Sequence, residues 1–133
     1  MKIASAISLV FLTALALACG YSAKATPPAT GSIPAISQLS PTSTNAGGPA
    51  FTLTVNGNNF GGKAVVNWNS SAQTTNTTVI SSKQLMVTIP AAMIATPGTV
   101  QITVTNPGTS GTGVYGNGGT LAETSSPMNF TVN

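Results

Sequence analysis

Short runs of alternating polar and apolar residues, separated by turn residues, constrain the fold of this chain most. Residues 51–55 (Phe-Thr-Leu-Thr-Val) are apolar at every second position with Thr between, and residues 100–105 repeat the pattern. A period of two residues is that of a β-strand with one buried face. No window carries the 3.6-residue period of an amphipathic helix. The body of the chain is therefore predicted to be all-β.

Seven such segments can be delimited, and each has one apolar face. Turn residues bound them; Asn56-Gly57, for example, is a strong turn signal and predicts that the strand from residue 51 stops there. Strands with one apolar face must bury it against a second sheet, which predicts a β-sandwich of about seven antiparallel strands in two sheets. The predicted strands are residues 36–39, 51–55, 64–68, 77–80, 85–89, 100–105 and 128–132.

The amino terminus has the pattern of an export signal. Lys2 precedes residues 3–18, an uncharged and largely apolar run of 16 residues. That run is shorter than the ~20 residues that a membrane-spanning helix needs, so residues 1–18 are predicted to be a signal peptide.

Two cleavage sites are compatible with this leader. Residues 15–20 resemble the lipobox of bacterial lipoproteins, in which the cysteine becomes the lipidated first residue; here that residue is Cys19, the only cysteine. The alternative is ordinary cleavage after Ala25, which gives a periplasmic or secreted chain that begins at Thr26. On the first reading, Cys19 anchors the protein to the bacterial outer membrane or cell surface, and residues 19–32 form a Thr/Pro/Gly-rich tether.

The charge inventory excludes most catalytic chemistry. Only 4% of the residues are charged, and Glu123 is the sole acid in a chain without histidine. Acid–base catalysis, nucleophile activation and metal binding need groups that this chain lacks, so we expect no enzyme activity, no catalytic residues, no metal site and no cofactor. Four scattered lysines without arginine are also not the cationic patch of a nucleic-acid-binding protein.

Several short motifs follow one another along the body of the chain. Residues 34–41 are followed by Ala46-Gly47-Gly48, then by a strand that runs into Gly-x-Asn-Phe, and then by a Val-x-aromatic strand at residues 66–68. In this order the motifs resemble the IPT/TIG family of immunoglobulin-like domains, and the resemblance covers residues 33–133. It implies that the predicted sandwich is immunoglobulin-like. The residues that carry the resemblance are Pro34, Ile36, Leu39, Pro41, Gly57, Asn59, Phe60 and Trp68.

Several of these residues have a predicted structural role. Gly57 is expected to take a positive φ angle at the end of its strand, and Asn59 to bond the turn backbone through its amide. Phe60 is expected to fold back and close the end of the sandwich. Trp68 is expected in the core, where immunoglobulin-like folds bury an aromatic residue, rather than as a stacking platform for a sugar or partner.

One segment departs from the compact family pattern. Residues 106–127, rich in Gly, Ser and Thr, are predicted to form a long loop before the last strand, either mobile or folded as a short extra hairpin. Tyr115 in this segment is the candidate ligand contact. The resemblance implies a non-enzymatic envelope lipoprotein with one binding module for an unknown protein or glycan partner. The alternatives are a structural spacer or assembly subunit and a carbohydrate-binding module.

Overall fold

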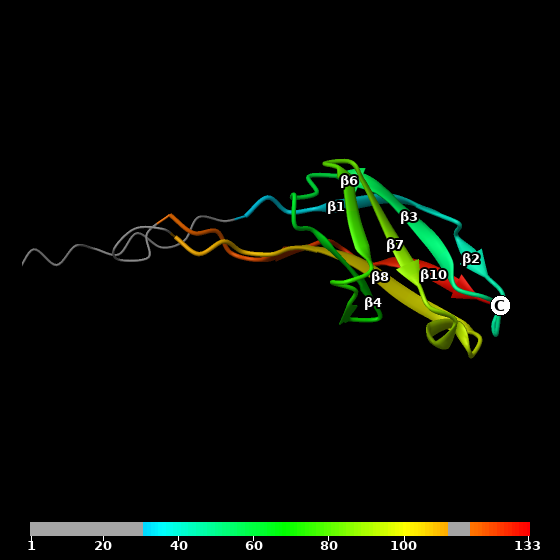
Figure 1. The fold of residues 1–133 in the computed structure, drawn as a ribbon. Coiled ribbons are helices and arrows are strands. Elements are labelled where there is room, and N and C mark those ends of the chain that lie inside the picture. Colours follow the sequence, from blue (N-terminus) through cyan, green and yellow to red (C-terminus); the bar gives the residue numbers. More distant parts are fainter. Residues whose placement is uncertain (1–30, 112–117) are drawn as a thin grey trace, which may run out of the picture.

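The structure is a computed structural model that describes residues 31–111 and 118–133. In these residues two β-sheets pack face to face, which confirms the predicted sandwich (Figure 1). The four-stranded sheet contains, in spatial order, β1 (Ala35–Ser40), β3 (Phe51–Asn58), β7 (Gln84–Ile89) and β6 (Thr77–Ser81). The six-stranded sheet contains β2 (Ser43–Thr44), β10 (Met128–Val132), β8 (Gly98–Asn106), β4 (Val65–Trp68) and β5 (Ser71–Ala72) in that order, while β9 (Glu123–Thr124) pairs with β8.

All seven predicted strands are present, and three two-residue strands join them. The seven predicted strands pair antiparallel with one another, as predicted, and the one parallel pair of the described residues joins β10 to the unpredicted β2. The chain leaves β1, passes a cis Ser40–Pro41 bond and crosses to the other sheet as β2. A 3₁₀ turn, η1 (Ala91–Ile94), is the one helical element of the described residues. No helix within those residues is long and apolar enough to cross a membrane.

The predicted turn at residues 56–57 is wrong, because β3 continues through these residues to Asn58. Asn56 pairs with Gln84 on one side of β3, and Asn58 pairs with Ala35 on the other. Pairing on both sides outweighs the local turn preference. The positive φ angle falls at Asn59, at 60°, and not at Gly57.

The core lies between the sheets and follows the period of two. On β3, β7 and β8 the buried residues alternate with exposed or half-exposed residues, most of which are threonine or another polar residue. Phe130 on β10 is fully buried at the centre, stacked on Phe51 with ring centroids 5.7 Å apart. No buried side-chain nitrogen or oxygen of the described residues lacks a hydrogen-bond partner. The alternation that predicted the fold thus also identifies most of the residues that form the core.

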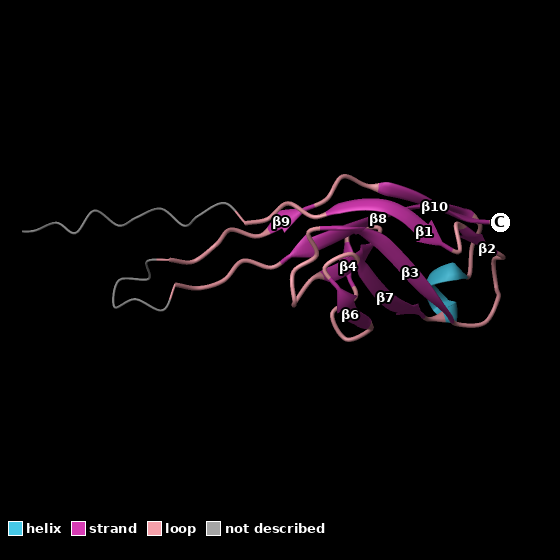
Figure 2. Ribbon diagram, turned by 90° about the horizontal axis from the view of Figure 1, so that it is seen from above, coloured by secondary structure: helices cyan, strands magenta, loops and turns pink. Residues whose placement is uncertain are grey.

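Residues 105–111 and 118–124 form a paired ribbon, which we call the arm (Figure 2). Thr105 pairs with Thr124, and further out Thr109 pairs with Thr120 through two backbone bonds of 3.1 and 3.0 Å. Of the two alternatives for residues 106–127, these described residues follow the hairpin. The arm and residues 31–34 leave one end of the sandwich, the arm pole, whereas Asn133 lies at the opposite end, the C-terminal pole (Figure 1).

Candidate functional site

The described part of the chain has few ionisable side chains. Its titratable side chains are Lys63, Lys83 and Glu123, none of which is buried. No group of three or more His, Cys, Asp or Glu residues that could hold a metal ion exists among these residues. Candidate sites are therefore surfaces and pockets that bind through hydroxyl, amide and apolar groups.

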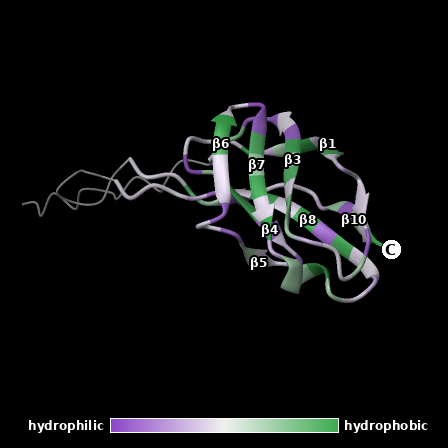
Figure 3. Ribbon diagram, turned by 45° about the vertical axis from the view of Figure 1, so that its right-hand side comes forward, coloured by the Kyte–Doolittle hydropathy of each residue, from purple (hydrophilic) through white to green (hydrophobic). Residues whose placement is uncertain are grey.

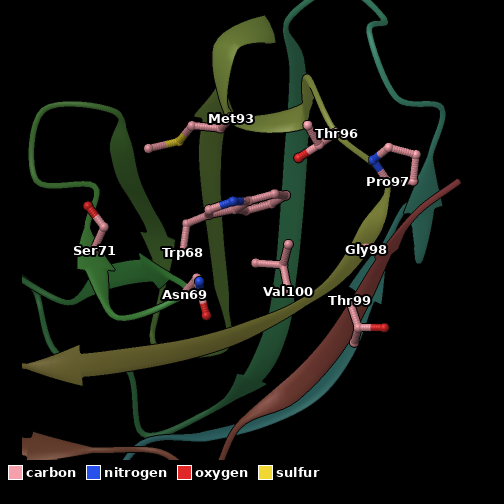
Figure 4. Close-up of a pocket in the computed structure, with 9 residues that line it drawn as sticks. All are labelled: Trp68, Asn69, Ser71, Met93, Thr96, Pro97, Gly98, Thr99 and Val100. Atoms are coloured by element: carbon pink, nitrogen blue, oxygen red, sulfur yellow. The ribbon is translucent and has the colours of Figure 1, made fainter.

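A pocket of about 450 Å³, which we call the Trp68 pocket, lies toward the C-terminal pole, beside the β4–β5 hairpin. Its walls come from the end of β4, from η1 and from the segment that leads into β8 (Figure 4). They combine hydroxyl and amide groups with a few apolar side chains and carry no charged residue. The lining residues are Trp68, Asn69, Ser71, Met93, Thr96, Pro97, Gly98, Thr99 and Val100.

Trp68 belongs mainly to the core and borders this pocket. Its side chain is 5% exposed, and its ring is tilted by 55° against Phe130 with the centroids 5.3 Å apart. The indole lies between Met93 and Val100 (Figure 4). Because so little of its side chain is exposed, Trp68 offers a ligand almost no surface for stacking.

The β4–β5 turn beside the pocket is a feature that the sequence did not indicate. Trp68 and Ser71 are paired, so Asn69 and Ser70 form a two-residue hairpin loop. Their φ angles are 48° and 69°, as a type I′ turn requires. Asn favours such a turn, but the usual second residue is Gly, and Ser in its place hides the signal. The Asn69 N–H donates to the Gln101 C=O (2.8 Å), which ties the turn to β8.

At the arm pole, two amide side chains hold the first described residues. Asn106, 8% exposed, donates from Nδ2 to the C=O of Ser32 and of Asn59, each at 2.7 Å, and accepts from the Gly61 N–H at 2.8 Å. Asn59 donates from its own Nδ2 to the Ile33 C=O (3.2 Å). The direction in which the chain leaves the domain at residue 31 is thereby fixed. An isolated Asn in a polar loop carries no sequence signal of this role, and Asn106 was missed.

Gly57 and Phe60 lie beside this amide cluster. Phe60 is 4% exposed and belongs to the core. A Cβ atom at Gly57 would overlap the Ala35 carbonyl oxygen and stand 2.6 Å from Phe60 Cζ. Close approach, rather than a positive φ angle, therefore requires glycine at position 57.

The remaining residues of the predicted signature lie on β1 or directly beside it. Pro34 and Leu39 are buried, Ile36 is half-buried and Pro41 is exposed. Cys19, the predicted lipidation site, and Tyr115, the predicted ligand contact, lie outside the described residues.

Two further hollows lie near the arm pole. One, of about 750 Å³, lies between residues 61–63 and 106–110, and Lys63 is the charged residue that lines it. The other, of about 380 Å³, lies between residues 33–36 and 124–128. Ile33 on its rim is 57% exposed.

The fold, with a strand that switches sheets and a buried aromatic pair, defines an immunoglobulin-like β-sandwich module. The IPT/TIG domain family model matches residues 34–131, and the chain belongs to this family. Searches of the curated proteins and of the solved structures found no match. Family membership supports the role of an immunoglobulin-like interaction module and does not indicate a partner.

Proposed function

We propose that this protein is a non-enzymatic lipoprotein of the cell envelope that presents one IPT/TIG module to a partner outside the membrane. The anchor is an acylated Cys19, and the location is the bacterial outer membrane or cell surface. The observation that carries the proposal is the polarity of the domain: residues 31–34 leave at the arm pole, and the Trp68 pocket lies toward the opposite pole.

The fixed exit of the chain supports this orientation. Asn106 and Asn59 hold the carbonyl groups of Ser32 and Ile33, so the tether starts in one direction relative to the sandwich. Residues 20–30 span at most about 35 Å at ~3.1 Å per residue in an extended Pro-rich form. A lipid at Cys19 would therefore keep the arm pole near the membrane and direct the Trp68 pocket away from it.

The composition of the Trp68 pocket supports a neutral partner. Its lining has hydroxyl and amide groups and no charged side chain, so it offers hydrogen bonds without electrostatic steering. We propose a protein partner whose contacting loop or strand is uncharged. A glycan is the alternative, and it would have to bind through hydroxyl and amide groups because the Trp68 side chain is only 5% exposed.

The anchor is tested by intact mass and by Cys19→Ala in the native host. We expect the wild-type chain in the membrane fraction with an acyl mass on Cys19, and we expect the variant to lose that mass. A mature chain that begins at Thr26 without acylation would overturn the anchor and favour the periplasmic or secreted alternative.

The partner site is tested by photo-crosslinking in intact cells. A photoreactive residue at Thr96, on the pocket rim, should give a discrete adduct with an envelope component. The same residue at Thr88, exposed on the outer face of the four-stranded sheet, is the matched control. Equal adducts at both positions, or none at Thr96, would contradict the proposed site.

The second candidate function, an assembly subunit, is favoured by one observation, the open edge of the four-stranded sheet at β6.

A further inference from the structure

We infer that the β6 edge of the four-stranded sheet pairs with the β6 edge of a second copy of this chain. The pairing involves neither Cys19 nor the Trp68 pocket, so it holds or fails independently of the proposed anchor and partner.

The β6 strand is the outermost strand of its sheet. It pairs antiparallel with β7, and no described strand lies along its other side (Figure 3). Proteins avoid unwanted pairing at such edges with Lys or Pro on the edge strand, an inward charge, a very short strand or a β-bulge. The sequence of β6 is Thr-Thr-Val-Ile-Ser and has no Lys, Pro or charge, so its bulge is the main protection of this edge. A bulge between Val79 and Ser81 shortens the regular part of the edge but leaves residues 77–79 in register.

The register shows which backbone groups face the open side. The Thr88 N–H donates to the Asn76 C=O (3.1 Å), so the backbone at Asn76 is directed toward β7. Bonding direction alternates along an antiparallel strand, so Thr78 also faces β7, whereas Val79 faces outward. The N–H and C=O of Val79 are therefore presented at the edge.

This arrangement is complementary to itself. With a two-fold axis at Val79, the N–H of Val79 in each copy donates to the Val79 C=O of the other, as in a hydrogen-bonded antiparallel pair. The four-stranded sheets of the two copies then join into one continuous sheet. Such a contact is isologous, which is the commonest way in which soluble proteins form dimers.

The side chains at the β6 edge are uncharged and partly apolar, so they are complementary to the same edge of a second copy and not to a charged partner. Ile80 is 51% exposed on β6, and the pairing places it beside Thr78 of the other copy. Met86, 38% exposed on β7, extends the apolar surface from the edge onto the sheet face. No charged side chain lies on β6 to repel its own copy, and the nearest one along the chain, Lys83, lies beyond the end of the strand. The contact is short, so the dimer is expected to be weak and to depend on concentration.

Engineered cysteines test the pairing in the full chain, expressed in its host. Thr78→Cys with Ile80→Cys puts a thiol of each copy opposite a thiol of the other. Both positions are exposed, so the substitutions leave the core intact. The matched control is Thr52→Cys with Thr54→Cys, which has the same spacing and points to the same face but lies on β3, inside the sheet. The unaltered chain, with Cys19 alone, gives the background.

Mild oxidation followed by a non-reducing gel is the measurement. We expect a disulfide-linked dimer from the β6 pair at a yield roughly tenfold above the β3 pair, because edge pairing raises the local concentration of only the β6 thiols. Equal yields from both pairs, or a higher yield from the β3 pair, would mean that copies meet through sheet faces. A yield at the Cys19 background for both pairs would mean that the chain does not pair. Either result would overturn the inference.

Discussion

Gly57 shows how one missing side chain lets two strands and a loop meet. A Cβ atom there would overlap the Ala35 carbonyl oxygen on β1 and crowd Phe60 Cζ at 2.6 Å. The carbonyl oxygen belongs to a paired backbone and cannot move aside without disturbing the β1–β3 ladder. The end of the sandwich at the arm pole is therefore closed by Phe60 only because residue 57 is glycine.

Gly57→Ala is expected to lower the free energy of unfolding by about 3 kcal/mol, at the upper end of the cost of overpacking. Gly62→Ala is the matched control, because no atom lies within 4 Å of its Cβ position and its φ angle is not positive. The control should change stability by less than about 0.5 kcal/mol. Urea unfolding of both variants, followed by Trp68 fluorescence, makes the comparison, and equal stability of the two would contradict the close-approach explanation.

Asn106 joins three backbone segments through one amide, and its removal is expected to be costly. Asn106→Ala leaves the C=O groups of Ser32 and Asn59 and the Gly61 N–H without this partner, which predicts a loss of about 3 kcal/mol. Asn67→Ala also removes two side-chain bonds, to Thr103 and Thr105, but on the half-exposed outer face of its sheet. Water can replace those bonds, so the expected loss is about 1 kcal/mol. Thermal unfolding distinguishes the two, and a larger loss for Asn67→Ala would refute the role given to Asn106.

The edge strands of this domain are protected from unwanted pairing because they are short or contain a bulge, and not because they carry charged residues. The edge strands β2 and β5 of the six-stranded sheet have two residues each, and both edge strands of the four-stranded sheet, β1 and β6, contain a bulge. A chain with so few charged residues cannot use the Lys residues that usually protect edges. Of these edge strands, β6 is the one with an exposed large apolar side chain, Ile80, so its bulge limits the proposed contact to a short stretch without abolishing it.

The arm contributes bonds but no large core side chain, because the buried core residues lie on the strands, η1 and the 60–64 segment. Replacement of residues 110–119 by Asn-Gly, a two-residue hairpin turn between the paired Thr109 and Thr120, is therefore expected to leave the sandwich folded. The change in the free energy of unfolding should stay within about 1 kcal/mol, since loop length enters only logarithmically. Circular dichroism and urea unfolding check this, and an unfolded product would mean that the arm is part of the cooperative unit.

Strands were predictable where burial and local pattern agree, and less so where tertiary pairing decides. Seven strands follow from alternation alone, but β2, β5 and β9 have two residues each, too few to show a period. The continuation of β3 past Asn56 depends on partners in β1 and β7 that a local reading does not contain. The same holds for the site: Trp68 was placed in the core from its strand, whereas the pocket beside it depends on η1 and the Asn69-Ser70 turn.

At the scale of the whole molecule, low charge predicts stability that hardly depends on pH. The chain has no histidine, and the ionisable side chains of the described part are two lysines and one glutamate. Neither lysine nor glutamate, as a residue type, changes its charge in model peptides between about pH 5 and pH 9. The slope of stability against pH requires a different number of bound protons in the folded and unfolded states. The thermal midpoint should thus shift by no more than about 2 °C between pH 5 and pH 8, given ~4–8 °C per kcal/mol for a domain of this size. A shift of ten degrees in differential scanning calorimetry would contradict this.

The placement of residues 31 and 133 at opposite poles of the domain has a mechanical consequence. A pull between residue 31 at the arm pole and Asn133 at the C-terminal pole acts along the strands. The parallel pair β2–β10 holds the end of the chain through bonds that run across that direction, among them Asn133 N–H to Thr44 C=O at 2.8 Å and Ala46 N–H to Asn133 C=O at 2.7 Å. Force applied in this way shears several hydrogen bonds together instead of opening them one after another. We therefore expect the domain to resist tension that is applied along its strands.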